Sequence, residues 1–111
     1  MANKIFEKIN QISVLANSIR FKILLALFNS DIRINNTKIG THSHSFGDLQ
    51  KIIQVEKPDL SYHLDIMNSS NLIEKSKKNK GIYHISKEGK EILKKFGVSR
   101  KLVKEEVRKI L

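Results

Sequence analysis

Apolar residues recur at helical spacing over much of this chain. Ile5, Ile9 and Ile12 stand at i, i+4 and i+7, which predicts an amphipathic helix over about residues 3–15. The following segment, IRFKILLALFNS, is apolar on most sides, and Ser18 before it is a good N-cap residue. A helix that is apolar nearly all round packs in the middle of a domain, so we expect this one to be central.

A long polar segment and a short helix come next. Residues 32–45 have no helical period and are rich in Asn, Thr, Gly and Ser, which predicts a loop that holds at most a short strand. Ser45 with Asp48 three residues later is a variant of the capping box. We expect a short helix there, with a buried stripe formed by Leu49, Ile52 and Ile53.

A second helix is predicted over about residues 58–69, after a tight turn at Val55–Lys57. Pro58 suits the first helical position, where the missing N–H would have no partner in any case. The apolar residues Leu60, Leu64 and Met67 would then face the core. Two short helices joined by such a turn form a helix-turn-helix pattern.

The rest of the chain predicts a β-hairpin and two helices. Residues 72–78 and 82–86 are typical of strands, and Asn79–Lys80–Gly81 between them is typical of a hairpin turn. Ser86 would cap a helix that ends at Gly97, and a last amphipathic helix would cover about 99–111. The sequence therefore predicts one domain over residues 1–111, mainly α with a small β-hairpin wing at about 72–86, a winged helix-turn-helix.

Charge and composition narrow the possible partners. The formal net charge is +10, and residues 74–111 hold 13 basic and 5 acidic side chains. Such an excess favours a polyanionic partner, although a lysine-rich solvated surface is an alternative explanation. No apolar run approaches the ~20 residues of a membrane span, and the first residues lack a signal-peptide pattern, so we expect a cytoplasmic protein without a membrane partner. The lack of cysteine excludes disulfides and thiolate metal sites.

Four segments resemble a known family: LANSIRFKILLAL (15–27), SFGDLQKII (45–53), LSYHLDIMNSSNLIEK (60–75) and IYHISKEGKEIL (82–93). They resemble the second helix, the positioning helix, the recognition helix with the first wing strand, and the second wing strand with the next helix of ArsR-type winged-helix transcriptional regulators of bacteria and archaea. The MarR and PadR groups are relatives. The resemblance covers about three quarters of the chain. It implies a DNA-binding fold rather than a metal sensor, because the cysteines of the family's best-known metal sites are missing here.

The predicted recognition helix presents a polar side to a duplex. Residues that point away from Leu60, Leu64 and Met67 could contact a phosphate or a base edge, with His63 on the flank of this side. For Asp59, complementing the helix dipole is the favoured alternative. The predicted contacts of the helix are Pro58, Asp59, Ser61, Tyr62, His63 and Asp65.

Acidic side chains on this helix repel phosphate, so affinity has to come from elsewhere. Lys75, Lys77, Lys78 and Lys80 lie on or beside the predicted hairpin and would contact the DNA backbone or the minor groove. Lysines that guard the edge of a solvated hairpin are a compatible alternative.

The two terminal helices carry apolar stripes that predict a homodimer, as in the ArsR-type family. The stripe residues are Ile5, Phe6, Ile9, Ile12, Leu102, Val103, Val107 and Ile110. The sequence favours a sequence-specific regulator of double-stranded DNA, with a non-specific architectural DNA-binding protein or a protein-interaction module as alternatives.

No catalytic pattern remains once the residues are placed on their elements, so we expect no enzyme, no cofactor and no metal site. His42 and His44 would need a third ligand to bind a metal, and the histidines of a polar loop usually have no such role. The sequence does not identify an effector.

Overall fold

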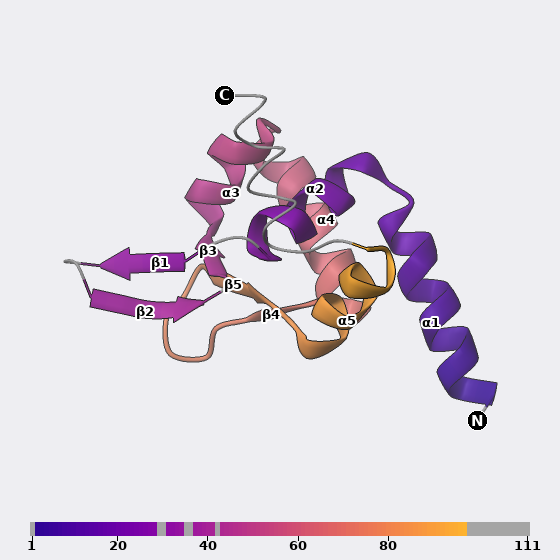
Figure 1. Cartoon of the computed structure of the whole chain (residues 1–111). Coiled ribbons are helices and arrows are strands. Elements are labelled where there is room, and N and C mark those ends of the chain that lie inside the picture. Colours follow the sequence, from indigo (N-terminus) through magenta and orange to yellow (C-terminus); the bar gives the residue numbers. More distant parts are fainter. Residues whose placement is uncertain (1, 29–30, 35–36, 42, 98–111) are drawn as a thin grey trace.

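The computed structural model describes residues 2–28, 31–34, 37–41 and 43–97, with side chains over 5–28 and 43–97. The five helices are α1 (Ala2–Leu15), α2 (Ser18–Phe28), α3 (Phe46–Ile53), α4 (Lys57–Ser69) and α5 (Lys87–Lys95). The strands are β1 (Asp31–Ile34), β2 (Thr37–Thr41), β3 (Ser43–Ser45), β4 (Ile73–Lys75) and β5 (Ile82–Ile85). This order confirms a mainly helical winged helix-turn-helix (Figure 1). The predicted helix over 99–111 lies outside the described residues.

Helix α2 lies at the centre of the core, as its apolar pattern predicted. Ile23, Leu24 and Leu27 have no exposed surface and belong to one buried cluster with residues of α3, α4, the wing and α5. Burying one such side chain contributes roughly 1.5–3 kcal/mol relative to leaving it exposed. The α2 surface therefore fixes how the other helices are placed around it.

The start of α2 differs from the prediction. Asn17, and not Ser18, is the capping side chain: its Oδ1 accepts hydrogen bonds from the backbone N–H groups of Ile19 at 2.9 Å and Arg20 at 3.1 Å. Ser18 is already the first residue of the helix. Both residue types cap helices well, so the sequence alone could not choose between them.

The other predicted helix starts are close to the observed ones. The Ser45 hydroxyl accepts from the Asp48 N–H at 3.0 Å, which confirms Ser45 as the N-cap of α3. Helix α4 begins one residue before Pro58, at Lys57. Ile52 was expected to be buried but is exposed. The reason is that the short α3 packs on the core through Leu49, with Ile52 at the border of that face.

The prediction of a loop over residues 32–45 was largely wrong. The backbone forms an antiparallel hairpin of β1 and β2, in which Asp31 pairs with Thr41 and Ile34 with Thr37. Strand β3 then pairs with β5. Polar β3, with the sequence Ser-His-Ser, gives no hydrophobic alternation, and it is a strand because the edge of β5 offers it hydrogen-bond partners. The hairpin and α1 project from opposite ends of the molecule (Figure 1).

Strands β3, β5 and β4, in that order, form a three-stranded antiparallel sheet. Its β4–β5 hairpin is the wing. Strand β4 is shorter than the predicted segment 72–78, whereas Gly81 has the positive φ of 77° that the turn chemistry required. The wing is tied to the helix-turn-helix, because the Phe46 N–H at the start of α3 donates to the Gly81 carbonyl at 2.8 Å.

Within the described residues, no single helix is long and apolar enough to cross a membrane. Ile5–Leu15 and Ser18–Phe28 pass that test only as a pair, and they are bent by 100° where they meet.

Candidate nucleic-acid interface

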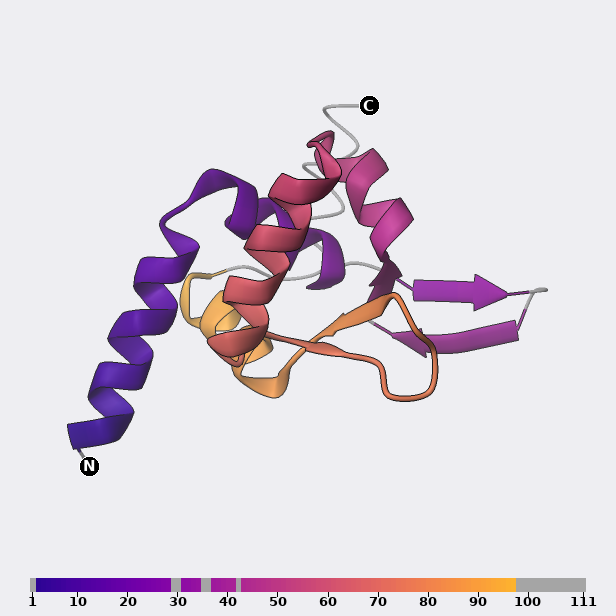
Figure 2. The same cartoon turned by 180° about the vertical axis from the view of Figure 1, so that it is seen from behind.

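The two helices of the helix-turn-helix are joined by three residues. Gln54 ends α3 with a left-handed φ of 61°, and its N–H donates to the Gln50 carbonyl at 2.8 Å. This conformation reverses the chain within a few residues, and Val55 of the turn packs against the core. Helix α4 is thereby presented beside α3 on one side of the molecule (Figure 2).

Helix α4 has one buried and one exposed side. Leu60, Leu64 and Met67 have no exposed surface, which confirms the predicted inward direction. The exposed side includes Tyr62, whose exposed fraction is 62%. Pro58, Asp59, Ser61 and Asp65 are exposed as well. A large aromatic side chain in that position is available to a partner, and its contact with DNA stays a prediction.

His63, predicted on the flank of α4 as an orienting or phosphate-contact residue, is more buried than a flank position implies. Its exposed fraction is only 9%, and among the described residues its Nδ1 has no hydrogen-bond partner. At 100° per residue it lies about 60° from Leu60, within the width of an apolar stripe that faces a core. Its ring stands edge-on to that of Tyr62, with centroids 5.4 Å apart. His63 therefore supports Tyr62 from the core side.

The surroundings of His63 favour its neutral form. Burial lowers its pKa below the ordinary value, and the positive charge of nearby Arg20 lowers the pKa further. The negative charge of Asp59 opposes this shift. The lowered pKa favours an uncharged His63 ring beside Tyr62 at neutral pH.

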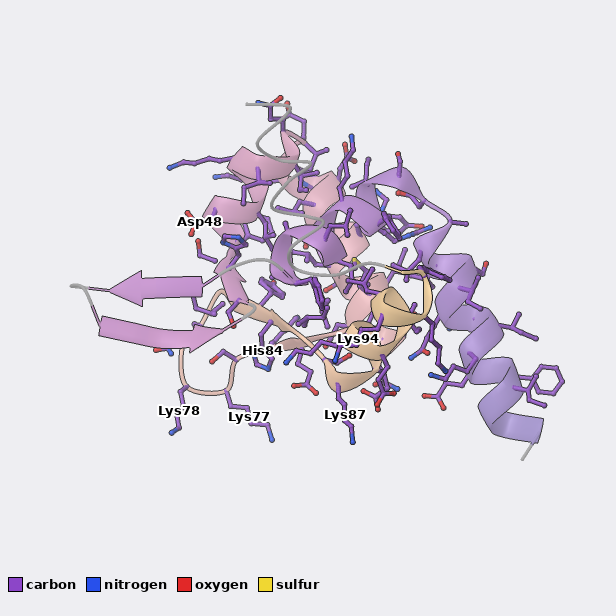
Figure 3. All side chains as sticks on the ribbon, in the orientation of Figure 1. Asp48, Lys77, Lys78, His84, Lys87 and Lys94 are labelled. Carbon is purple, nitrogen blue, oxygen red and sulfur yellow. The ribbon has the colours of Figure 1, made fainter. Side chains whose placement is uncertain are left out.

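The wing lysines predicted to contact DNA are all exposed. Lys77 and Lys78 extend from the lower edge of the molecule in Figure 3. Lys75 is nearer α4: its Nζ lies 3.7 Å from Asp65 Oδ1. This exposed pair is worth at most about 1 kcal/mol, but it links α4 with the wing and partly neutralises the acidic side chain.

The basic excess after residue 73 extends beyond the wing. Lys87, Lys90 and Lys94 fall on one flank of α5, while Glu88 and Glu91 fall on the other. Among the described residues, none of the three lysines is paired with an acidic side chain. Lys87 points to the same lower edge as the tip of the wing (Figure 3). The predicted DNA contacts do not include this flank, although the helical spacing of the three lysines would have revealed it.

A joint connects the end of α4 with the beginning of the wing. Asn71 has a left-handed φ of 60°, and the Leu72 N–H donates to the Met67 carbonyl at 3.0 Å. The Ser86 hydroxyl lies 2.6 Å from the Asn71 carbonyl and 2.9 Å from the Leu72 carbonyl, either of which it can donate to. It also accepts from the Gly89 N–H at 2.9 Å, which confirms Ser86 as the cap of α5. The sequence predicted the cap but not the contacts with the joint.

Two histidine–carboxylate contacts flank the sheet. His84 Nε2 lies 2.9 Å from Glu74 Oε2, across the paired strands of the wing. His44 Nδ1 lies 3.9 Å from Asp48 Oδ2; burial lowers the pKa of His44, and Asp48 opposes the shift. His42 lies outside the described residues, and within them no three metal-binding side chains come together.

Helix α1 carries the exposed apolar residues Ile5, Phe6, Ile9 and Ile12, which we call the α1 stripe. Between 50% and 67% of each side chain is exposed. The structure thus leaves uncovered the N-terminal residues predicted to form a dimer interface. The C-terminal ones, Leu102, Val103, Val107 and Ile110, lie outside the described residues.

No protein-family model and no curated protein matches this sequence. Among solved structures, the chain is similar to reduced HlyU from Vibrio cholerae N16961, with a TM-score of 0.63. The match has 20% sequence identity and covers 89% of this chain and 97% of HlyU. At this identity the likeness concerns the fold, and the winged helix-turn-helix seen here is the fold that the chain shares with HlyU.

Proposed function

We propose that this chain is a transcriptional regulator that binds double-stranded DNA sequence-specifically as a homodimer. The observation that carries the proposal is the exposed Tyr62 on a recognition helix directly beside a wing with four exposed lysines. Winged helix-turn-helix domains place such a helix in the major groove. The resemblance to ArsR-type regulators and the fold shared with HlyU support the same function.

The charges favour a division of labour between helix and wing. Helix α4 is weakly charged on its exposed side, so it is suited to select a sequence through hydrogen bonds and stacking rather than to supply affinity. The wing lysines are suited to neutralise phosphates, which supplies affinity without sequence preference. The Lys75–Asp65 pair would open where Lys75 turns to a phosphate, leaving Asp65 available to a cytosine amino group.

A second copy of the chain is proposed to cover the α1 stripe. Four neighbouring large apolar side chains, each at least half exposed, form a surface that association would remove from water. A two-fold dimer would present two α4 helices to major grooves about 34 Å apart, on a pseudo-palindromic site. A monomer in light scattering at micromolar concentration would refute this part of the proposal.

The contact assignment is tested with duplexes selected from a random pool. Tyr62→Ala is expected to weaken binding to the selected sequence by about 1–3 kcal/mol and binding to unrelated duplex much less, because base contacts carry specificity. Phe96→Ala is the matched control: it removes another exposed aromatic side chain, that of the C-cap residue directly after α5, and should change binding to neither duplex. Equal losses on both duplexes would refute the role of Tyr62.

The wing is tested by its salt dependence. Lys77→Ala with Lys78→Ala should weaken binding to both duplexes and flatten the slope of log K against log salt by up to about 1.8 units. The matched pair Lys87→Ala with Lys94→Ala removes the same charge from α5 and should change the slope less.

The lysine flank of α5, which has no acidic partner within the described part of the chain, favours a second candidate, a non-specific architectural protein that coats DNA. For that protein, both lysine pairs would flatten the slope equally and no duplex sequence would be enriched in the selection.

A further inference from the structure

The two sides of α1 carry different chemistry. At 100° per residue, Glu7, Gln11 and Val14 fall on one side, nearly opposite Ile9 at the middle of the α1 stripe. Gln11 and Val14 are buried against the molecule, while the α1 stripe is exposed. Helix α1 therefore lies between the body of the protein and the surface proposed to receive a second copy.

Gln11 joins α1 to the end of the recognition helix. Its Nε2 donates to the Ser70 carbonyl at 3.0 Å, across 59 positions of sequence, and Ser70 is the C-cap residue directly after α4. The exposed fraction of Gln11 is 1%, and its Oε1 has no hydrogen-bond partner among the described residues. A buried amide that uses only its donor side is a poor way to fill space, because an unmet polar atom costs free energy where an apolar side chain would not. Packing alone does not explain a glutamine here.

A second polar contact reaches the same joint. Asn71 Nδ2 donates to Glu7 Oε1 at 3.4 Å, one helical turn before Gln11 on the same side of α1. Asn71 is the residue with φ of 60°, two positions before the first wing strand, β4, begins at Ile73. Helix α1 thus holds the backbone at the point where the recognition helix ends and the wing starts.

We infer that Gln11 is a positioning residue that couples the α1 stripe to the recognition helix. This inference rests on the proposed function as a dimeric DNA-binding protein. A hydrogen bond weakens steeply when its angle changes, so the Gln11–Ser70 bond is made only for a narrow range of α1 tilts. A second copy bound to the α1 stripe fixes that tilt. The backbone at Ser70 and Asn71 is then ordered before DNA binds, so DNA binding requires less free energy to order it.

The test is a double-mutant cycle on a duplex that carries one half-site. A single half-site removes the avidity of two linked sites, so any effect of dimerisation on affinity must pass through the protein. Ile9→Glu places a charge in the α1 stripe to separate the two copies. Gln11→Met keeps an unbranched side chain of similar length and removes the donor and the unpaired acceptor.

Ile9→Glu is expected to weaken half-site binding about fivefold in the parent protein, the factor that corresponds to one net hydrogen bond. In the Gln11→Met background the same change should weaken it less than about twofold, since the coupling is already lost. Asn10→Met makes the same exchange of amide for thioether at an exposed position of α1, and it should leave the fivefold effect intact.

A second variant keeps the test decisive if Gln11→Met does not fold, as judged by circular dichroism. Asn71→Gly suits the positive φ, leaves the core unchanged and removes the amide that contacts Glu7. In the Asn71→Gly background, Ile9→Glu should also weaken half-site binding less than it does in the parent protein. This reduction should be smaller than in the Gln11→Met background, because the Asn71–Glu7 contact is exposed.

An equal loss from Ile9→Glu in every background would overturn the inference, as would a parent protein that is already monomeric. The proposed sequence-specific binding is decided separately by Tyr62→Ala on the selected duplex. A result in which Tyr62→Ala loses specificity and the cycle shows no coupling would therefore refute only the role of Gln11.

Discussion

Replacing Ser86 with alanine removes one hydroxyl that holds three parts of the molecule together. Ser86 is 2% exposed and stands between the last wing strand and α5. Its oxygen accepts from the Gly89 N–H at 2.9 Å, and the hydroxyl can donate to the carbonyl oxygen of either Asn71 or Leu72, which lie 2.6 and 2.9 Å away. Alanine fits the space but can neither donate nor accept.

The expected cost follows from these contacts. Loss of an N-cap hydrogen bond destabilises a protein by about 1 kcal/mol. The lost bond to the joint adds about 1 kcal/mol, at the low end of the range because the Leu72 carbonyl keeps the Ser86 N–H at 3.0 Å. The sum of about 2 kcal/mol is a large part of the 5–15 kcal/mol typical of a domain, and it corresponds to a fall in Tm of about 8 °C.

Urea unfolding followed by circular dichroism measures this loss, which should appear as a lower midpoint with an unchanged slope. Ser76→Ala is the matched control. The Ser76 hydroxyl accepts one exposed bond, from the Asn79 N–H at 3.1 Å, so its loss should cost less than about 0.5 kcal/mol. If Ser86→Ala cost no more than Ser76→Ala, the joint would not depend on Ser86 and the reasoning would be wrong.

Three further predictions concern stability. Gly89→Ala should lower Tm although alanine favours helices, because a Cβ there would clash with the Leu72 carbonyl oxygen; an unchanged or higher Tm would contradict this contact. Gln54→Gly should raise the free energy of unfolding by about 0.5–1 kcal/mol in urea titrations by relieving φ of 61°, and a loss would show that the Gln54 side chain matters more than its backbone. The pKa values of His63 and His44 are lowered by burial, so the unfolded chain takes up protons first and stability should fall as pH drops below about 6.5. His63→Gln should make the free energy of unfolding depend less on pH between pH 7 and 5. An unchanged dependence would show that His63 does not contribute to it.

Much of the helical framework was predictable because its signals are local. The i, i+4 spacing of α1, the all-round apolar surface of α2 and the inward face of α4 each depend on residues a few positions apart. The Ser45 and Ser86 caps and the positive φ of Gly81 are equally local, since each satisfies neighbouring backbone groups or relieves a single steric clash. The polar composition of 32–45 pointed the other way, towards a loop.

The candidate site was predictable in its outline but not in its contacts. The spacing of α4 separates Tyr62 from Leu60, yet it leaves His63 at the border, where the width of the buried stripe decides between core and solvent. The pairing of Lys75 with Asp65 also escaped the sequence, because it depends on how closely the wing folds against the helix.

What the sequence by itself determined is the type and order of most elements and the face that each helix buries, because these follow from backbone geometry over one or two turns. Only the tertiary structure decided which distant groups meet. Polar β3 became a strand because β5 lies beside it. Gln11 reached Ser70, and Ser86 reached Asn71, because burial around α2 brings those segments together. Such contacts join positions 15 to 59 residues apart, and no local pattern encodes them.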